Sequence, residues 1–184
     1  STINHKSIKM KKYFLLFTIA LLYIGCDESQ KSDDTTEKNK MIFNKNVSTI
    51  KEMLNGFNEE NPEKFMKVFA DSVRWSGPDK IKLDDYDSRE VLETALTGYM
   101  SLYDNHELRD IRFFGGSAYS DTGSGSENPN AVRVFGNWHH THTETQIDVT
   151  HKWMGIMWFD EDGKINQFSD FFDVGGFLNQ HLNQ

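Results

Sequence analysis

The feature that most constrains this fold is a series of three long β-strand patterns near the C-terminus. They cover about residues 131–143, 148–159 and 164–172. Between the last two, Asp160-Glu161-Asp162-Gly163 is a strong hairpin turn signal. Long strands joined by short turns predict antiparallel pairing, because parallel neighbours would need long crossover connections.

Helical patterns come first along the chain. Residues 46–58 place apolar side chains at helical spacing, and Asn61-Pro62 predicts a second, short helix with Asn61 as its N-cap. Asp87-Ser88-Arg89-Glu90 has a capping-box pattern and predicts a third helix, with His106 just past its C-terminus. Another strand follows over about residues 107–119. Helices followed by antiparallel strands predict an α+β fold.

The predicted strands are apolar on both faces. One face of the 148–159 strand carries Met154, Ile156 and Trp158, and the other carries Trp153, Met157 and Phe159. One face packs on the helices, and the other also needs a cover. We therefore expect a second subunit on the outer face, and so a homodimer.

The N-terminal segment resembles a bacterial lipoprotein signal. Met10-Lys11-Lys12 precedes an apolar run over residues 13–25, and Cys26, the only cysteine, follows directly. The run is short for a bilayer span, which takes about 20 apolar residues. The resemblance implies cleavage before Cys26 and lipid on its thiol. A plain secreted protein or an uncleaved anchor is the alternative.

This pattern predicts three parts. Residues 1–25 form the signal peptide, with 1–9 as upstream sequence; residues 26–42 form the lipidated cysteine and a disordered tether; residues 43–184 form the folded domain. Residues 27–40 contain no apolar side chain, which favours a solvated tether. We expect the protein to be lipid-anchored in the cell envelope, at the outer membrane in a Gram-negative cell.

The charge balance argues against a nucleic-acid partner. The signal contains four lysines and no acidic residue, so the mature chain would have 16 basic and 28 acidic residues. Nucleic-acid binding needs a basic surface. The expected partners are therefore a small apolar molecule, a membrane reached through the lipid, and a second copy of the chain.

Two segments resemble the SnoaL-like branch of the nuclear transport factor 2-like superfamily. They are Val68-Phe69-Ala70-Asp71-Ser72-Val73-Arg74-Trp75 and Asp162-Gly163-Lys164-Ile165-Asn166-Gln167-Phe168-Ser169-Asp170-Phe171-Phe172-Asp173. The resemblance covers about residues 45–182. It implies a cone, in which a curved antiparallel sheet wraps around about three helices and encloses an apolar pocket. Relatives include polyketide cyclases, steroid isomerases, an epoxide hydrolase and dehydratases. In the cyclases an Asp on the closing strand is the acid/base, and that position falls on Asp170.

Strand register gives an independent view of the same site. Two-residue turns at Asp162-Gly163 and Thr145-Gln146 would place Asp170 opposite Gly155 and His140 opposite His151. Because side chains alternate between faces, one face would then collect Trp138, His140, His142, His151, Trp153, Met157, Phe168, Asp170 and Phe172. His139 would lie on the opposite face. Aromatic walls with few ionisable groups are typical of a ligand pocket.

The histidines of Trp138-His139-His140-Thr141-His142 leave three interpretations open. His140, His142 and His151 share the predicted face and could bind zinc. Asp170 would lie opposite Gly155, which is four residues along the strand from His151. At about 13 Å, Asp170 is then too far from these histidines to bind the same metal. The other two interpretations are a polar strand end near a hairpin and a pocket rim used in ligand binding or proton transfer.

The candidate site residues follow from this face. Asp170 is the candidate catalytic base, because an apolar pocket raises the pKa of a carboxyl group, and His151 is its candidate partner. A structural carboxylate bonded to a helix N-terminus or a Trp N–H is the alternative. The candidate ligand-binding residues are Trp75, Tyr99, Tyr103, Trp138, His140, Trp153 and Phe168. Aromatic residues such as the first three more often belong to the plain core. Asp173 is predicted to cap a C-terminal turn.

Three functions fit these residues. The first is an envelope-anchored protein that binds a small hydrophobic or aromatic molecule and catalyses proton transfer, as in isomerisation, cyclisation or dehydration, without a cofactor. The second is a non-catalytic dimeric binding or interaction module of the cell envelope. The third is a His-rich metal-binding protein.

Overall fold

The computed structural model describes residues 27–82, 84–116 and 128–182. The predicted signal segment and Cys26 therefore lie outside the described residues. The chain divides into two compact units, of which Asn39–Gln184 holds the sheet and the other ends at Lys38. Within the described residues, no helix combines the length and the apolar character that crossing a membrane requires.

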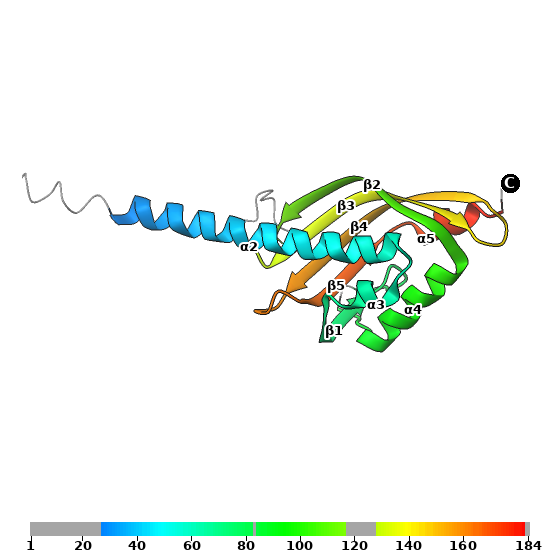
Figure 1. Ribbon diagram of the computed structural model, residues 1–184, viewed down its shortest axis with the longest axis horizontal. Coiled ribbons are helices and arrows are strands. Elements are labelled where there is room, and N and C mark those ends of the chain that lie inside the picture. The colour runs from blue at the N-terminus through cyan, green and yellow to red at the C-terminus, as the bar shows by residue number, and fades with distance from the viewer. Residues whose placement is uncertain (1–26, 83, 117–127, 183–184) are drawn as a thin grey trace, which may run out of the picture. The chain divides into compact units, whose positions relative to one another are not determined.

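The larger unit is built on one curved five-stranded sheet (Figure 1). Its strands are β1 (Phe69–Ser76), β2 (Tyr103–Gly115), β3 (Ala131–His142), β4 (Asp148–Phe159) and β5 (Ile165–Phe171), in the spatial order β1-β5-β4-β3-β2. The β2–β3, β3–β4 and β4–β5 pairs are antiparallel, and for the last two pairs the short turns predicted this. The edge strand β1 pairs with β5 in parallel, and no pattern in the sequence predicted this pairing.

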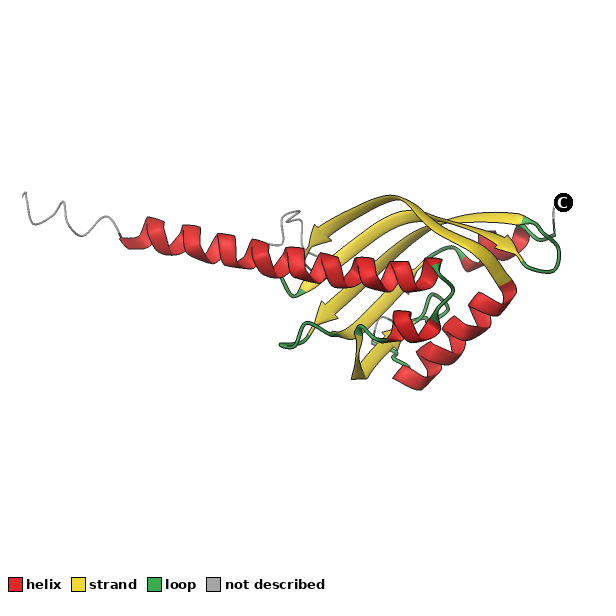
Figure 2. Cartoon of the chain, in the orientation of Figure 1, coloured by secondary structure: helices red, strands yellow, loops and turns green. Residues whose placement is uncertain are grey.

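Four helices complete the described fold (Figure 2). They are α2 (Asp27–Asn58), α3 (Pro62–Met66), α4 (Arg89–Leu102) and α5 (Val174–Asn179). The predicted caps of two helices are confirmed: Asn61 accepts a hydrogen bond from the backbone N–H of Lys64 (2.9 Å), and Asp173 accepts one from Gly176 (2.9 Å). Together, the helices and the curved sheet confirm the α+β cone.

Helix α2 corrects the predicted tether. It begins at Asp27, whereas the apolar periodicity predicted a helix only from about residue 46 and a disordered segment up to residue 42. No Gly or Pro occurs between residues 27 and 55, so nothing in this stretch interrupts helix propagation. Apolar spacing identifies only the part of a helix that packs on a core, and it therefore missed the polar first turns.

The connection from α4 into β2 also differs from the prediction. The N-cap of α4 is Ser88, without a side-chain cap bond, while Asp87 binds Lys80 (2.9 Å), so the predicted capping box does not form. Helix α4 ends at Leu102, so Tyr103 and His106 belong to β2. His106 is 4% exposed within β2, and its ring also bonds the backbone of Tyr103, the C-cap of α4.

Both hairpins that build the pocket wall have longer loops than predicted. In β3–β4 the pairing of Thr141 with Asp148 leaves a longer loop, so Trp138, and not His140, pairs with His151. This shift of two residues keeps every side chain on its predicted face, because the side-chain period of a strand is two. In β4–β5 an irregularity at the turn compensates for the extra loop length, and Asp170 pairs with Gly155 as predicted.

The core lies between the inner face of this sheet and the helices. Trp153, Met157 and Phe159 on β4 are buried at 6% exposure or less, and they pack with Ile50 and Met53 of α2. The predicted inner face is therefore confirmed. On the outer face, Met154 and Trp158 remain partly exposed.

A candidate acid–base site in an aromatic cavity

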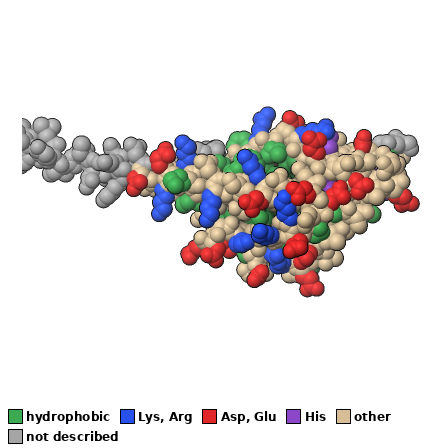
Figure 3. Space-filling model, in the orientation of Figure 1, with side chains coloured by type: hydrophobic (Ala, Val, Ile, Leu, Met, Phe, Trp, Pro, Cys, Tyr) green, Lys and Arg blue, Asp and Glu red, His purple; other side chains and the backbone are tan. Residues whose placement is uncertain are grey.

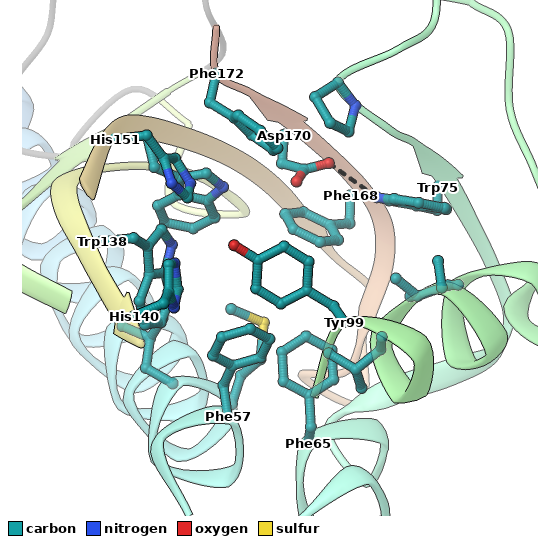
Figure 4. Close-up of a pocket in the computed structure, with 17 residues that line it drawn as sticks. Phe57, Phe65, Trp75, Tyr99, Trp138, His140, His151, Phe168, Asp170 and Phe172 are labelled. Atoms are coloured by element: carbon teal, nitrogen blue, oxygen red, sulfur yellow. Dashed lines mark hydrogen bonds between the residues drawn. The ribbon is translucent and has the colours of Figure 1, made fainter. Parts of the chain in front are cut away.

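A cavity of about 190 Å³ opens between the inner sheet face and the helices (Figure 4). Side chains from α2, α3, α4, β3, β4 and β5 line it, together with Trp75 of β1 and Pro78 of the following loop. Apart from the indole N–H groups, its polar lining consists of Tyr99, His140, His151 and Asp170. Among the described residues that line the cavity, Asp170 is the only carboxylate, and none is Lys or Arg. The cavity therefore suits an apolar molecule that meets a few polar groups.

Asp170 projects from β5 into this cavity. It accepts a hydrogen bond from the indole N–H of Trp75 at 3.0 Å, which Figure 4 shows as a dashed line. Burial among apolar side chains raises the pKa of Asp170 to about 7, while hydrogen bonds from Trp75 and Trp153 act in the opposite direction. Asp170 is therefore a carboxyl group that changes its protonation state near neutral pH.

Gly155 explains how an indole ring comes so close to this carboxyl group. It pairs with Asp170 across the β4–β5 ladder. A Cβ at position 155 would lie 2.5 Å from the Trp153 ring, so glycine leaves the space that this ring occupies. The Trp153 indole packs against Trp138 on one side and Phe168 on the other, which fixes its position beside Asp170.

A cluster of histidines forms another part of the wall. His140 is 2% exposed, and its Nδ1 lies 2.8 Å from Nδ1 of His106, so the two rings share a hydrogen bond. The His151 ring stacks on His140 (5.3 Å between centroids) and packs at a tilt against Phe172 (4.4 Å). Burial lowers the pKa of His106 and His151 to about 4, and that of His140 further still, because burial and the neighbouring histidines act together. All three rings are therefore neutral at pH 7.

Two predicted residues take positions outside the cavity lining. Tyr103 was predicted to bind ligand, but it lies behind Tyr99, where its ring stacks at 4.7 Å and its hydroxyl bonds His181 at 2.8 Å. His142 was placed on the pocket face, yet it sits at the hairpin end beside Thr145 and His181. The reason is the same for both residues: they lie past the end of the cavity, next to the β3–β4 loop.

The metal-site alternative gains no support from this geometry. Within the described ranges, no three His, Cys, Asp or Glu side chains are arranged to hold a metal ion. His140 is engaged with His106, and His142 lies apart at the hairpin end. His139 lies on the opposite face next to Arg109, as predicted.

The remaining predicted residues do line the cavity. These are Trp75, Tyr99, Trp138, His140, His151, Trp153, Phe168 and Asp170. Their roles in binding or catalysis stay predictions. His106 was not among the predicted site residues. It reaches His140 because β2 has two irregularities, beside Asn105 and near Asp110. Both residues have positive φ (54°), and Asn and Asp tolerate that conformation better than most residues, so a signal for these irregularities was present.

No protein-family model matches this sequence, and neither does any curated protein. Solved structures do match its fold. The chain has the NTF2-like fold. A proposed polyketide cyclase from Xanthomonas campestris superposes with a TM-score of 0.58 at 13% identity, over 76% of this chain and 98% of that one.

Two further matches carry different descriptions. An NTF2-like protein of unknown function from Burkholderia pseudomallei has a TM-score of 0.55 at 18% identity, over 74% of this chain and 96% of that one. An LEH-like epoxide hydrolase from M. tuberculosis has a TM-score of 0.53 at 14% identity, over 76% and 90%. At these identities the matches establish the NTF2-like fold of this chain and not its reaction.

Proposed function

We propose that this protein binds a small apolar or aromatic molecule in the cavity and catalyses a proton transfer on it. The observation that carries the proposal is Asp170, a carboxyl group with a pKa of about 7 inside an aromatic cavity. A base with a pKa near the working pH combines a useful ionised fraction with a strong driving force for proton abstraction. The polyketide cyclase and epoxide hydrolase descriptions of two structural neighbours support a small-molecule reaction.

In the proposed reaction, ionised Asp170 takes a proton from a carbon atom of the substrate and returns it at another position. The Trp75 N–H stabilises the carboxylate and orients it toward the cavity. His151 is neutral and acts as the partner that hydrogen-bonds the substrate oxygen on which negative charge develops. The cavity lining around the carboxylate is almost entirely apolar, and the proposed reaction uses no cofactor.

An isotope-exchange experiment tests this proposal without knowledge of the natural substrate. The probe is 2-indanone, a neutral bicyclic ketone whose α-protons exchange with D₂O when a base removes them. We expect the protein to accelerate the exchange, with a rate that rises as the pH passes about 7 and Asp170 ionises. Asp170→Asn should abolish the acceleration, and Asp173→Asn, at the cap of α5, should retain it. Equal acceleration by the wild type and Asp170→Asn would exclude Asp170 as the base.

A non-catalytic interaction module is the second candidate, and the outer sheet face favours it. Phe135 is 36% exposed on this face and lines a groove there together with Phe114, Arg133 and Lys152. We propose that a second copy of the chain covers it. Sedimentation velocity should detect a dimer that Phe135→Glu dissociates and that Leu178→Glu, an exposed position on α5, does not. A wild-type monomer would contradict this proposal.

Two further expectations remain proposals about cellular context. We propose a lipid anchor at Cys26 in the cell envelope, supported by the basic and apolar residues that precede this cysteine. Mass spectrometry of the protein from bacterial membranes should find a lipid-modified Cys26 at the N-terminus, and Cys26→Ser should release the protein. We also propose no nucleic-acid partner, since the mature chain would have 16 basic and 28 acidic residues, and both kinds are interspersed on the face shown in Figure 3.

A further inference from the structure

Several polar atoms around the cavity have no partner among the described residues. They are the hydroxyl of Tyr99, Nε2 of His106, Nε2 of His140 and Nδ1 of His151, and all four are buried. Three of these residues line the cavity, and they come from α4, β3 and β4. A buried polar atom without a partner costs about 1–3 kcal/mol. A cluster of such atoms from three separate elements therefore calls for a function.

The rings that carry these atoms lie close together. The Tyr99 and His140 centroids are 5.3 Å apart, and so are those of His140 and His151. Figure 4 shows the Tyr99 ring reaching into the cavity, with its hydroxyl pointing toward the wall that carries Trp138, His140 and His151. One small polar group placed among these rings could therefore contact more than one of the unpartnered atoms.

The hydrogen bond between the two buried histidines keeps His140 available for such a group. Its Nδ1 is occupied by His106 at 2.8 Å, and its Nε2 lies on the other side of the ring. His140 is 2% exposed and packs against Trp138 at 5.5 Å, so the ring cannot turn toward solvent. Nε2 thus remains buried, without a partner among the described residues, on a side chain that lines the cavity.

The charges around the cavity determine which polar group fits. Burial lowers the pKa of His140 and His151 and raises that of Tyr99, so all three are neutral at pH 7. Neither Lys nor Arg occurs among the described residues of the lining, and Asp170 contributes a negative charge when it ionises. An anionic ligand would therefore lose its hydration without gaining a cationic partner. A neutral oxygen can use the hydrogen-bonding capacity of Tyr and neutral His without that cost.

We propose that Tyr99, His140 and His151 bind a neutral oxygen of the ligand, either a hydroxyl or a carbonyl. The substrate class is then a neutral alcohol, phenol or ketone, and not a carboxylic acid or a phosphate. Its size follows from the cavity: an apolar cavity of about 150 Å³ holds benzene, so about 190 Å³ accommodates one or two rings. This inference rests on the proposed function only in requiring that the cavity bind a ligand.

Three matched probes test the inference on the purified full chain. The probes are p-cresol, p-xylene and 4-methylbenzoate, which differ only in the group opposite a methyl: hydroxyl, methyl or carboxylate. Affinity is measured by ligand-observed NMR and by quenching of tryptophan fluorescence. We expect p-cresol to bind about tenfold or more tightly than 4-methylbenzoate, because the carboxylate loses its hydration.

Tyr99→Phe provides the decisive comparison, because it removes one oxygen atom and no bond within the fold. It should weaken the binding of p-cresol by about fivefold or more, which corresponds to one lost hydrogen bond, and change the affinity for p-xylene by no more than about twofold. Tyr103→Phe is the matched control, since its hydroxyl bonds His181 outside the cavity, and it should change neither affinity. Equal weakening of both probes by Tyr99→Phe, no weakening of either, benzoate binding as tight as cresol, or no binding of any probe would each overturn the inference.

This test separates the binding site from the proton transfer. Asp170→Asn should keep the preference for p-cresol over 4-methylbenzoate, and Tyr99→Phe should keep its selective effect on p-cresol in that background. If the preference holds while 2-indanone exchange fails, the oxygen site stands and the proposed reaction falls. If exchange depends on Asp170 but the probes do not respond to Tyr99, the reaction stands and the oxygen site falls.

Discussion

Burial changes ionisation differently at two ends of the cavity, the Asp170 end and the histidine end formed by His106, His140 and His151. Both withdraw titratable groups from water, and burial disfavours the charged form at each. At Asp170, however, indole N–H groups of Trp75 and Trp153 favour the carboxylate, so its pKa stays at about 7. At His140 no such support exists, and its histidine neighbours oppose protonation further.

This difference shows how one cavity can hold two kinds of polar group. Donors placed at a buried acid leave it able to ionise, whereas buried bases that face one another remain neutral. The first arrangement suits proton transfer, and the second suits hydrogen bonding to an uncharged oxygen. Measurements of stability against pH can test the two ends separately, because their titrations affect folding with opposite signs.

The largest expected effect is acid destabilisation from the histidine end. His106, His140 and His151 have folded pKa values below the ordinary 6.5, so the unfolded state binds more protons as the pH falls below 6.5. Their stabilising contribution is therefore present above pH 6.5 and lost as the pH falls toward 4. In an Asp170→Asn background, which removes the opposing titration, we expect the free energy of unfolding to drop by about 3–6 kcal/mol over this range. Urea denaturation at several pH values measures it, and a flat profile would contradict the neutral cluster.

The next effect comes from the Asp170 end. Its folded pKa of about 7 exceeds the ordinary 3.8, so the ionised carboxylate is unfavourable in the fold and its cost grows as the pH rises from 4 to 7. Asp170→Asn should therefore stabilise the protein at pH 8 by about 3–4 kcal/mol more than at pH 4. The same denaturation experiment gives this difference. A pH-independent effect would mean that Asp170 ionises in the fold as readily as in water.

Removing one hydrogen-bond donor should make the charged form of Asp170 less favourable, as the charged form already is for the histidines. Trp75→Phe deletes the N–H that bonds Asp170 at 3.0 Å, and a hydrogen bond to a charged group contributes about 1.5–3 kcal/mol. We expect the pKa of Asp170 to rise from about 7 to about 8 or higher. NMR titration of the Asp170 side-chain carbon measures this pKa. Trp158→Phe, on the outer face, serves as the control and should leave it unchanged.

Sequence patterns were enough to identify one wall of this site and not the other. Alternation along β3, β4 and β5 placed Trp138, Trp153 and Asp170 on one face, and a two-residue error in the β3–β4 register did not matter because it preserves parity. The contact of His106 with His140 could not be read in this way. It depends on the irregular β2 strand, where each register shift changes which residues face inward.

Strand patterns also did not predict that Trp75 is the residue that bonds Asp170. A Trp N–H was one expected partner of a structural carboxylate at this position, but nothing in the sequence indicated that β1 pairs with β5 in parallel. That pairing places Trp75 opposite Phe168, within reach of the next inward-facing residue, Asp170. Long-range pairing of an edge strand leaves no local signal, which is why the fold was more predictable than the site.

The smallest expected effect compares two adjacent tyrosines that differ in one bond. The Tyr99 hydroxyl has no partner among the described residues, whereas the Tyr103 hydroxyl bonds His181 at 2.8 Å. Tyr99→Phe should therefore raise the free energy of unfolding by about 1 kcal/mol, because it removes an unsatisfied buried group, and Tyr103→Phe should lower it by about the same amount. Urea denaturation at pH 7.5 resolves the sign of each change. If Tyr99→Phe is destabilising, its hydroxyl is bonded within the protein itself, and the histidine end would lose its best donor for a ligand oxygen.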